Sequence, residues 1–160
     1  MASSETFNAE GGCSCGEVRF RITSAPIFTH GCHCTDCQRL SGGAFAINAM
    51  IETDRVEVLA GTPKSVPVST PSGKGQNIMR CPTCNTALWS HYGGAGDKLA
   101  FVRAGTLDDT SLIEPDIHIF TRSKQPWVIL PEGKPAVEVY YDAKEMFPAE
   151  GLARMGALRG

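Results

Sequence analysis

The residues best suited to chemistry are seven cysteines that fall into three close clusters. Cys13 and Cys15 form the first cluster, Cys32, Cys34 and Cys37 the second, and Cys81 and Cys84 the third. An odd number of thiols leaves no complete disulfide scheme, and no basic region followed by an apolar run directs export. In a reducing compartment, such close spacing indicates metal binding or redox chemistry. We therefore expect a cytoplasmic metal-binding protein.

The first and third clusters together have the composition of a closed zinc site. Pairs of thiolates from loops distant in sequence commonly complete a four-coordinate structural zinc. Cys81-Pro82-Thr83-Cys84-Asn85 has the form of a zinc knuckle, in which Asn85 can adopt a left-handed conformation and backbone N–H groups point at sulfur. We predict one zinc ion on Cys13, Cys15, Cys81 and Cys84; the alternative is that the two sites share these ligands in another combination.

The middle cluster is one ligand short of a tetrahedral site. Three thiolates leave a fourth position, which catalytic zinc sites keep for water or substrate. An iron–sulfur cluster matches less well, because it would need an unusual fourth ligand. We predict a catalytic zinc on Cys32, Cys34 and Cys37. The alternative is a structural site that a histidine closes, and the candidates are His30, His33, His91 and His118.

Polar residues next to the middle cluster are weaker candidates. His33 lies between two expected ligands and could carry a proton in catalysis, or it could cap the loop. Asp36 or Gln38 could hydrogen-bond the ligands and Arg39 could bind a substrate carboxylate, although surface exposure explains each equally well. His118 and Trp127 are interpreted as packed residues, with Trp127 in the core or at its rim.

Composition and apolar periodicity predict one mainly β domain. The chain has 160 residues with 17 Gly and 10 Pro, which indicates many turns between short strands. A helical turn is expected at 36–41, stopped by Gly42, and a short helix near the C-terminus at 149–158. The predicted strands are 17–23, 44–51, 55–59, an edge segment at 66–68, 78–80, 87–92, 99–102, 117–120 and 137–141.

Net charge and hydropathy argue against nucleic acid and membranes as partners. A net charge of −2 and a pI near 6.1 give no basic surface for nucleic acid. No apolar stretch approaches the ~20 residues that cross a bilayer, so we expect no membrane attachment. We expect a loosely docked tail at 1–10, a zinc-binding domain at 11–145 and a C-terminal tail at 146–160 with helical character.

The order and spacing of the cysteines resemble the family of glutathione-dependent formaldehyde-activating enzymes, which includes centromere protein V. Three blocks carry the resemblance: 12–16, around Cys13 and Cys15; 32–42, from Cys32 to Gly42; and 81–84. A late block, His118-Ile119-Phe120 through Lys124-Gln125-Pro126-Trp127, is similar to the closing segment of the family. The resemblance covers about residues 11 to 142.

The resemblance implies both a fold and an activity. The fold is one of stacked antiparallel sheets built around a structural zinc on the outer cysteine pairs and a catalytic zinc on the middle three. The activity is carbon–sulfur lyase chemistry, in which glutathione or a similar small thiol joins formaldehyde or another small aldehyde, as in S-(hydroxymethyl)glutathione synthase.

Two alternatives belong to other functional classes. The chain could be a non-catalytic binding module in which both metals are structural. Methionine sulfoxide reduction would need a free nucleophilic cysteine. Two occupied zinc sites would leave no cysteine free for that reaction.

Overall fold

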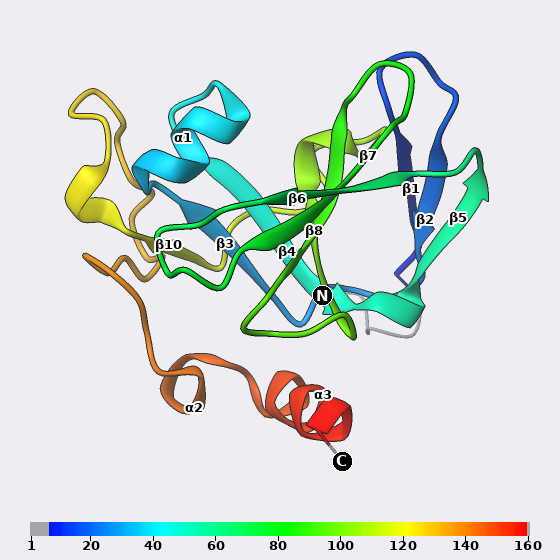
Figure 1. The fold of residues 1–160 in the computed structure, drawn as a ribbon. Helices are drawn as coiled ribbons and strands as arrows, with labels where there is room; N and C mark the ends of the chain where they lie inside the picture. The colour runs from blue at the N-terminus through cyan, green and yellow to red at the C-terminus, as the bar shows by residue number, and fades with distance from the viewer. Residues whose placement is uncertain (1–6, 160) are drawn as a thin grey trace.

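The computed structural model describes residues 7–159 and shows a mainly β protein with two sheets (Figure 1). The smaller sheet has the strand order β1-β2-β5 and the larger β10-β3-β4-β9-β8-β7-β6. Neighbouring strands are antiparallel except β10, which runs parallel to β3. The strands are β1 (Ala9–Gly12), β2 (Arg19–Ile22), β3 (Phe28–Cys32), β4 (Ala46–Glu52), β5 (Val56–Ala60), β6 (Lys64–Val68), β7 (Gln76–Arg80), β8 (Ala87–Tyr92), β9 (Leu99–Arg103) and β10 (Ile117–Ile119).

Short helices join and cover these sheets. The α-helices are α1 (Thr35–Ser41), α2 (Ala143–Met146) and α3 (Ala149–Arg159), and single 3₁₀ turns occur at Thr53–Arg55, Ala104–Thr106 and Thr121–Ser123. The predicted mainly β fold with a short C-terminal helix is confirmed. No helix in the described part of the chain is both long and apolar enough to cross a membrane.

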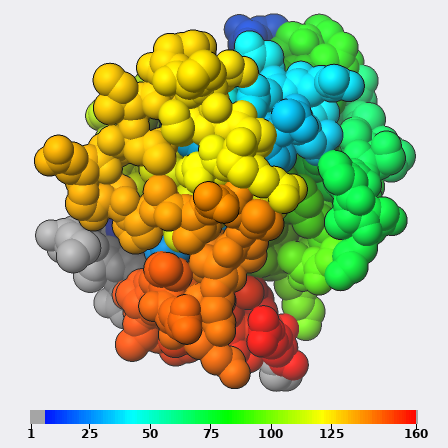
Figure 2. Space-filling view, turned by 90° about the vertical axis from the view of Figure 1, so that its left-hand side faces the viewer, coloured from blue at the N-terminus to red at the C-terminus, as the bar shows by residue number. Residues whose placement is uncertain are grey.

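The larger sheet is covered on both faces. Side chains alternate between the two faces of a strand, so β4 directs Ala49 and Ile51 to one core and Ala46 and Met50 to another. The first core lies against the smaller sheet through residues such as Phe20. The second lies under the C-terminal segment, which spreads in orange and red over one side of the molecule in Figure 2.

The sequence predicted most element positions, including the edge strand β6 with its proline. Helix α1 ends at Gly42, whose φ of 69° is left-handed, as expected. Strand β1 begins at Ala9, inside the segment expected to be a loose tail at 1–10, because Ala9 and Glu10 pair with β2. The first six residues of that expected tail lie outside the described residues.

The predicted strand at 137–141 is wrong. This segment follows β10 through hydrogen bonds such as Val137 N to His118 O (2.9 Å), but only His118 and Ala136 form a β-bridge. Phe120 has a left-handed φ of 55° directly after β10, and this conformation ends the extended partner strand. The apolar alternation at 137–141 therefore reflects packing on the second core rather than strand pairing.

Helix α3 is fastened to β4 by a buried ion pair. Arg154 donates from Nε to Glu52 Oε1 (2.8 Å) and from Nη2 to Glu52 Oε2 (2.6 Å). The same guanidinium donates to the Ala25 carbonyl oxygen (2.9 Å) and to Ser24 Oγ (3.1 Å). Burial would raise the pKa of the Glu52 carboxyl, but the hydrogen bonds from Arg154 and the nearby positive charges hold it below its usual value.

Replacing this arginine should loosen the C-terminal helix. Arg154→Met removes both hydrogen bonds to the buried Glu52 carboxylate and leaves it only the longer ion pair with Arg55 (3.5 Å), so we expect the free energy of unfolding to fall by about 2 kcal/mol in urea denaturation. Because the folded-state pKa of Glu52 is lowered, the wild type keeps this contribution above the reference value of 4.5 and loses it as the pH falls further. Arg159→Met, on the exposed end of α3, is the control, and an equal loss in both variants would contradict the role of the ion pair.

Candidate functional site

Two groups of cysteine side chains converge in the structure. The sulfur atoms of Cys13, Cys15, Cys81 and Cys84 lie within 4.8 Å of one another, as do those of Cys32, Cys34 and Cys37. Both sets are those that the sequence predicted. The alternative in which the clusters share ligands in another combination is not observed among the described residues.

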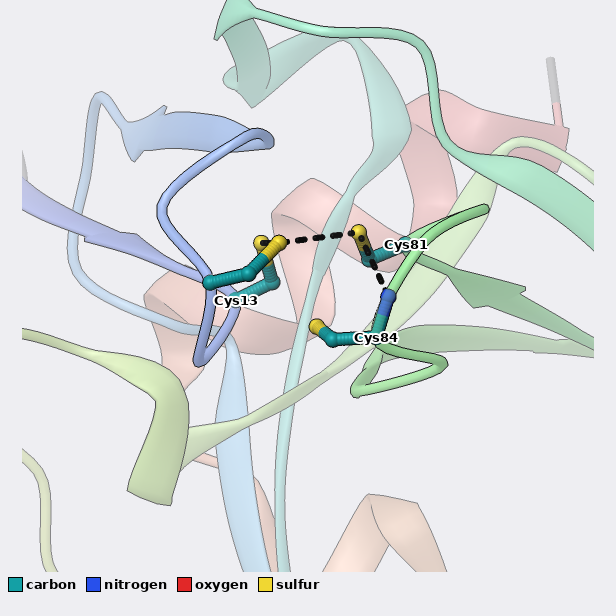
Figure 3. A group of neighbouring side chains, drawn as sticks. Cys13, Cys81 and Cys84 are labelled. Carbon is teal, nitrogen blue, oxygen red and sulfur yellow. Dashed lines mark hydrogen bonds between the residues drawn. The ribbon is translucent and has the colours of Figure 1, made fainter.

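The four-cysteine group joins two turns that are remote in sequence. Cys13 and Cys15 lie in the turn between β1 and β2, and Cys81 and Cys84 lie in the turn between β7 and β8. Figure 3 shows Cys13, Cys81 and Cys84 facing one another across the space between these turns. A Glu17 carboxylate and a Thr86 hydroxyl bridge the turns further: Thr83 Oγ1 donates to Glu17 Oε2 (2.9 Å), and Ser14 N donates to Thr86 Oγ1 (3.2 Å).

Backbone N–H groups donate hydrogen bonds to two of these four sulfurs. Val18 N donates to Cys13 Sγ (3.2 Å), and Thr83 N and Cys84 N donate to Cys81 Sγ (3.4 and 3.5 Å). Asn85 has a φ of 63°, the predicted left-handed conformation that closes the knuckle. Backbone N–H groups directed at sulfur stabilise thiolates, the form in which cysteine binds metal.

The spacing of the four sulfurs fits tetrahedral zinc. Zinc–thiolate bonds of ~2.3 Å in a tetrahedron place neighbouring sulfurs about 3.8 Å apart. Cys13 Sγ lies 3.6 Å from Cys15 Sγ, which lies 3.7 Å from Cys81 Sγ. This group could hold one zinc ion without rearrangement of the two turns.

The three-cysteine group lies where β3 meets α1. Cys32 is the last residue of β3, Cys34 is the N-cap of α1, and Cys37 lies in the first turns of this helix. The capping atom is itself a sulfur, because Cys37 N donates to Cys34 Sγ (3.2 Å). A strand end and a helix start thus bring three thiols together within six residues.

Protons are unevenly shared among the three thiols. Hydrogen bonds from the Cys32 and Cys37 thiols lower the pKa of Cys34 to about 2 against the effect of burial, and backbone N–H groups add to this. The pKa of Cys32 is raised by its hydrogen bonds to Cys34 and Cys37 and by burial. Hydrogen bonding to Cys32 and the charge of Arg103 lower the pKa of Cys37. Cys34 and burial raise it by more, so the pKa of Cys37 is about 11. The hydrogen bonds among the three thiols therefore favour the thiolate at Cys34 over the other two positions.

Histidines do not complete this group. No histidine, aspartate or glutamate of the described residues joins the three sulfurs within 4.8 Å. His30 Nε2 bonds the Tyr141 hydroxyl, and His91 Nδ1 bonds the Leu99 carbonyl oxygen (2.9 Å). His33 Nε2 and His118 Nδ1 bond each other (2.9 Å). The structure thus gives no protein ligand of these types for the fourth position.

His33, which lies between Cys32 and Cys34 in the sequence, has its ring buried among aromatic side chains. It stacks on Phe45 with ring centroids 4.6 Å apart, and its Nδ1 has no hydrogen-bond partner in the described structure. Burial, followed by the effects of His118 and Lys124, lowers the pKa of His33 to about 4. Gly31 makes room for His118, since a Cβ at this glycine would lie 2.8 Å from His118 Nδ1. His118 is a packed, hydrogen-bonded residue, as the sequence analysis inferred.

Gln38 ties the cysteine loop to the late sequence block. Its Nε2 donates to the His33 carbonyl oxygen (2.9 Å) and the Ser123 carbonyl oxygen (3.0 Å), and its Oε1 accepts from Gln125 Nε2 (2.8 Å). In Figure 2 the cyan and yellow segments that contain these residues lie side by side. Gln38 therefore supports the loop backbone through these contacts.

Other polar candidates from the sequence lie further from the sulfurs or at the surface. Burial and the charge of Cys34 raise the pKa of Asp36. Arg39 is exposed on α1. Trp127 is 70% exposed, so its assignment to the core is wrong and only a place at the surface remains.

Two residues near the site carried no usable signal in the sequence. Arg103 ends the apolar strand β9 and acts electrostatically on Cys37. Tyr92 ends β8 and is half-buried. Desolvation is the main cause that raises its pKa; the charge of Arg103 acts against this, and the three cysteines add to it. Strand periodicity places both residues on a face, but it does not show which distant loop covers that face.

These features define a class of mainly β proteins with a four-cysteine group between two turns and a three-cysteine group at a strand–helix junction. The family model of glutathione-dependent formaldehyde-activating enzyme matches residues 8–123, which is more than half of the chain. The chain belongs to this family, and the resemblance inferred from the cysteine blocks is confirmed.

Named relatives agree with this assignment. A protein of Halomonas elongata is 28% identical over 156 residues, covering 94% of this chain and 98% of its own length, and a protein of Talaromyces marneffei is 26% identical over 135 residues, covering 82% and 71%. Both carry the provisional name glutathione-dependent formaldehyde-activating enzyme. A crystal structure of a Rhodobacter sphaeroides protein aligns with a TM-score of 0.46 at 18% identity, over 66% of this chain and 91% of that one.

Metal content should separate the two groups of cysteines. We expect the purified protein to contain two zinc ions per chain by mass spectrometry, one for each group, and both Cys84→Ser and Cys34→Ser to contain one. Cys84→Ser should lower the melting temperature more, because the four-cysteine group joins turns from the two different sheets. Equal metal content in wild type and Cys34→Ser would contradict a metal at the three-cysteine group.

Proposed function

We propose that this protein is a zinc-dependent carbon–sulfur lyase-type enzyme that joins a small thiol such as glutathione to formaldehyde or another small aldehyde. Cys32, Cys34 and Cys37 would hold the catalytic zinc, and Cys13, Cys15, Cys81 and Cys84 the structural one. We assign both sites to one cytoplasmic domain at 11–145. The proposal joins the family membership to the geometry of the three-cysteine group.

The observation that carries the proposal is the incomplete ligand set at the strand–helix junction. Three sulfurs converge there, and no histidine or carboxylate of the described residues joins them, whereas the other group has four sulfurs. A tetrahedral zinc on three protein ligands keeps one position for an exchangeable partner. A zinc bound there would deprotonate a thiol that coordinates it.

The reaction itself forms one bond and moves one proton. The sulfur of the thiol attacks the aldehyde carbon and forms the carbon–sulfur bond, while the π bond of the carbonyl breaks and its electron pair moves to oxygen, which leaves a carbon–oxygen single bond. The proton lost by the thiol ends on the new hydroxyl group, so no oxidant or reductant is needed. The residues of the chain have to bind the two reactants together and provide a path for this proton.

His33 is our candidate for carrying that proton. Among the buried side-chain nitrogen and oxygen atoms of the described residues, His33 Nδ1 and Gln76 Oε1 lack a hydrogen-bond partner. His33 lies between Cys32 and Cys34, and its other nitrogen is paired with His118. A neutral imidazole with one free nitrogen can accept or donate a proton, which supports this role.

Exchange measured by NMR tests the proposed activity. We expect wild type to accelerate the exchange between glutathione, formaldehyde and their adduct over buffer, and Cys34→Ser to lose this acceleration because the ligand set is broken. Thr35→Ala, at the exposed start of α1, is the control and should retain it. Exchange in the presence of wild type at the rate of buffer alone would refute the activity.

A second measurement separates the enzyme from a non-catalytic module with two structural metals. We expect the cobalt-substituted protein to change its visible spectrum when a thiol is added, because one coordination position at the three-cysteine group can exchange. The cobalt in Cys34→Ser, bound by the four-cysteine group alone, should not respond. A wild-type spectrum indifferent to thiols would favour the binding module.

A further inference from the structure

We infer that Arg80 and Arg103 form a carboxylate-binding subsite beside the three-cysteine group, so that the enzyme selects thiols that carry a carboxylate over neutral thiols. This inference rests on the proposed function, since it names the class of thiol that the site accepts.

The cavity lies between the C-terminal end of α1 and the start of β4. Its volume is about 380 Å³, and Leu40 and Ser41 of α1 form one wall. Phe45 and Ala46, which precede and begin β4, also line the cavity, as do the two arginines. Ser41 is four residues after Cys37 on the same helix, so both lie on one face of α1.

The strand register places Arg103 on the same face of the sheet as the cysteines. His30 of β3 pairs with Asn48 of β4, and Asn48 pairs with Arg103 of β9. Cys32 lies two residues after His30 on β3 and pairs with Ala46, which lines the cavity. Residues two apart on a strand share a face, so Cys32 and Arg103 point the same way. Strand spacing puts their Cα atoms about 12 Å apart.

The partners of both arginines are neutral. Arg103 donates to Asn48 Oδ1 and to Ser90 Oγ (3.3 Å), and Arg80 donates to the Asn85 carbonyl oxygen (2.8 Å). These contacts orient the guanidinium groups with no carboxylate as hydrogen-bond partner among the described residues, and the charge of Arg103 also acts on Cys37 and Asp36. Asn48 and Ser90 are 3% and 0% exposed, so the Arg103 head is held from a rigid polar base in the sheet.

Two fixed positive charges at the wall of a partly apolar cavity fit a carboxylate. Guanidinium groups bind carboxylates through charge-assisted, often paired, hydrogen bonds. In a tripeptide whose central residue carries the thiol, a terminal carboxylate lies about 7 Å away at full extension, and the arginine and cysteine side chains extend into the rest of the roughly 12 Å between their Cα atoms. A thiol peptide with its sulfur at the cysteines could therefore place a terminal carboxylate at the arginines.

Calorimetric binding of S-methylglutathione to the full-length zinc protein tests the subsite. The methyl group removes the thiol while both carboxylates remain, so the signal does not depend on catalysis or on thiol coordination. We expect the dimethyl ester of this probe, whose carboxylates are neutralised, to bind at least about tenfold more weakly to wild type. We expect a similar weakening for the acid with Arg80→Gln and with Arg103→Gln, and partial recovery with Arg80→Lys and Arg103→Lys.

Arg122→Gln, at an exposed position outside the cavity, is the matched control and should bind as wild type does. Equal binding of acid and ester to wild type would overturn the inference without any variant that might fold poorly. Loss of binding in Arg39→Gln with normal binding in both cavity variants would overturn it as well. If binding depends on the carboxylates but wild type does not accelerate the adduct exchange, the subsite stands and the proposed function is refuted. If wild type accelerates the exchange but binding does not depend on the carboxylates, only the subsite is refuted.

Discussion

The convergence of two cysteine pairs, Cys13 with Cys15 and Cys81 with Cys84, is the constraint on which the rest of this structure depends. One pair belongs to a turn of the three-stranded sheet and the other to a turn of the seven-stranded sheet, 66 positions apart between Cys15 and Cys81. A cation held by all four sulfurs would fix the distance between the sheets at one end of the first core. The order of the larger sheet then determines where β3, and with it the second cysteine group, must lie.

The second cysteine group is supported from within the larger sheet. The parallel pairing of β10 with β3 brings the late block of the chain to the loop after Cys32. There Gln38 and Ser123 both donate to the His33 carbonyl oxygen, so two segments remote in sequence hold one loop. A loop held in this way loses little further conformational freedom when its sulfurs bind a ligand. The supporting residues act by positioning the backbone and do not touch the sulfurs.

The sequence was informative wherever a local rule controls the structure. The spacing of the cysteines depends on ligand chemistry, and both predicted groups of cysteines converge in the structure. The left-handed conformation of Asn85 and the proline in the edge strand β6 follow from backbone sterics. It was uninformative where remote packing decides. The alternation at 137–141 is the same whether a segment pairs as a strand or lies on an apolar surface, and the left-handed Phe120 that ends β10 has no composition signal. The position of Arg103 near the cysteines can be derived only from the register of β3, β4 and β9.

The ion pair between Arg154 and Glu52 has a consequence for where this protein can be cut. The family model ends at residue 123, yet the nearer of the two cationic partners of the buried Glu52 side chain, Arg154, lies in α3, and only Arg55 (3.5 Å) lies inside the family segment. A shortened chain ending at the family boundary would uncover Phe28 and Met50 and leave a carboxylate facing an apolar surface. A shortened version of this protein would therefore need Glu52 and its apolar neighbours redesigned together, because the family segment alone would expose an aggregation-prone apolar face.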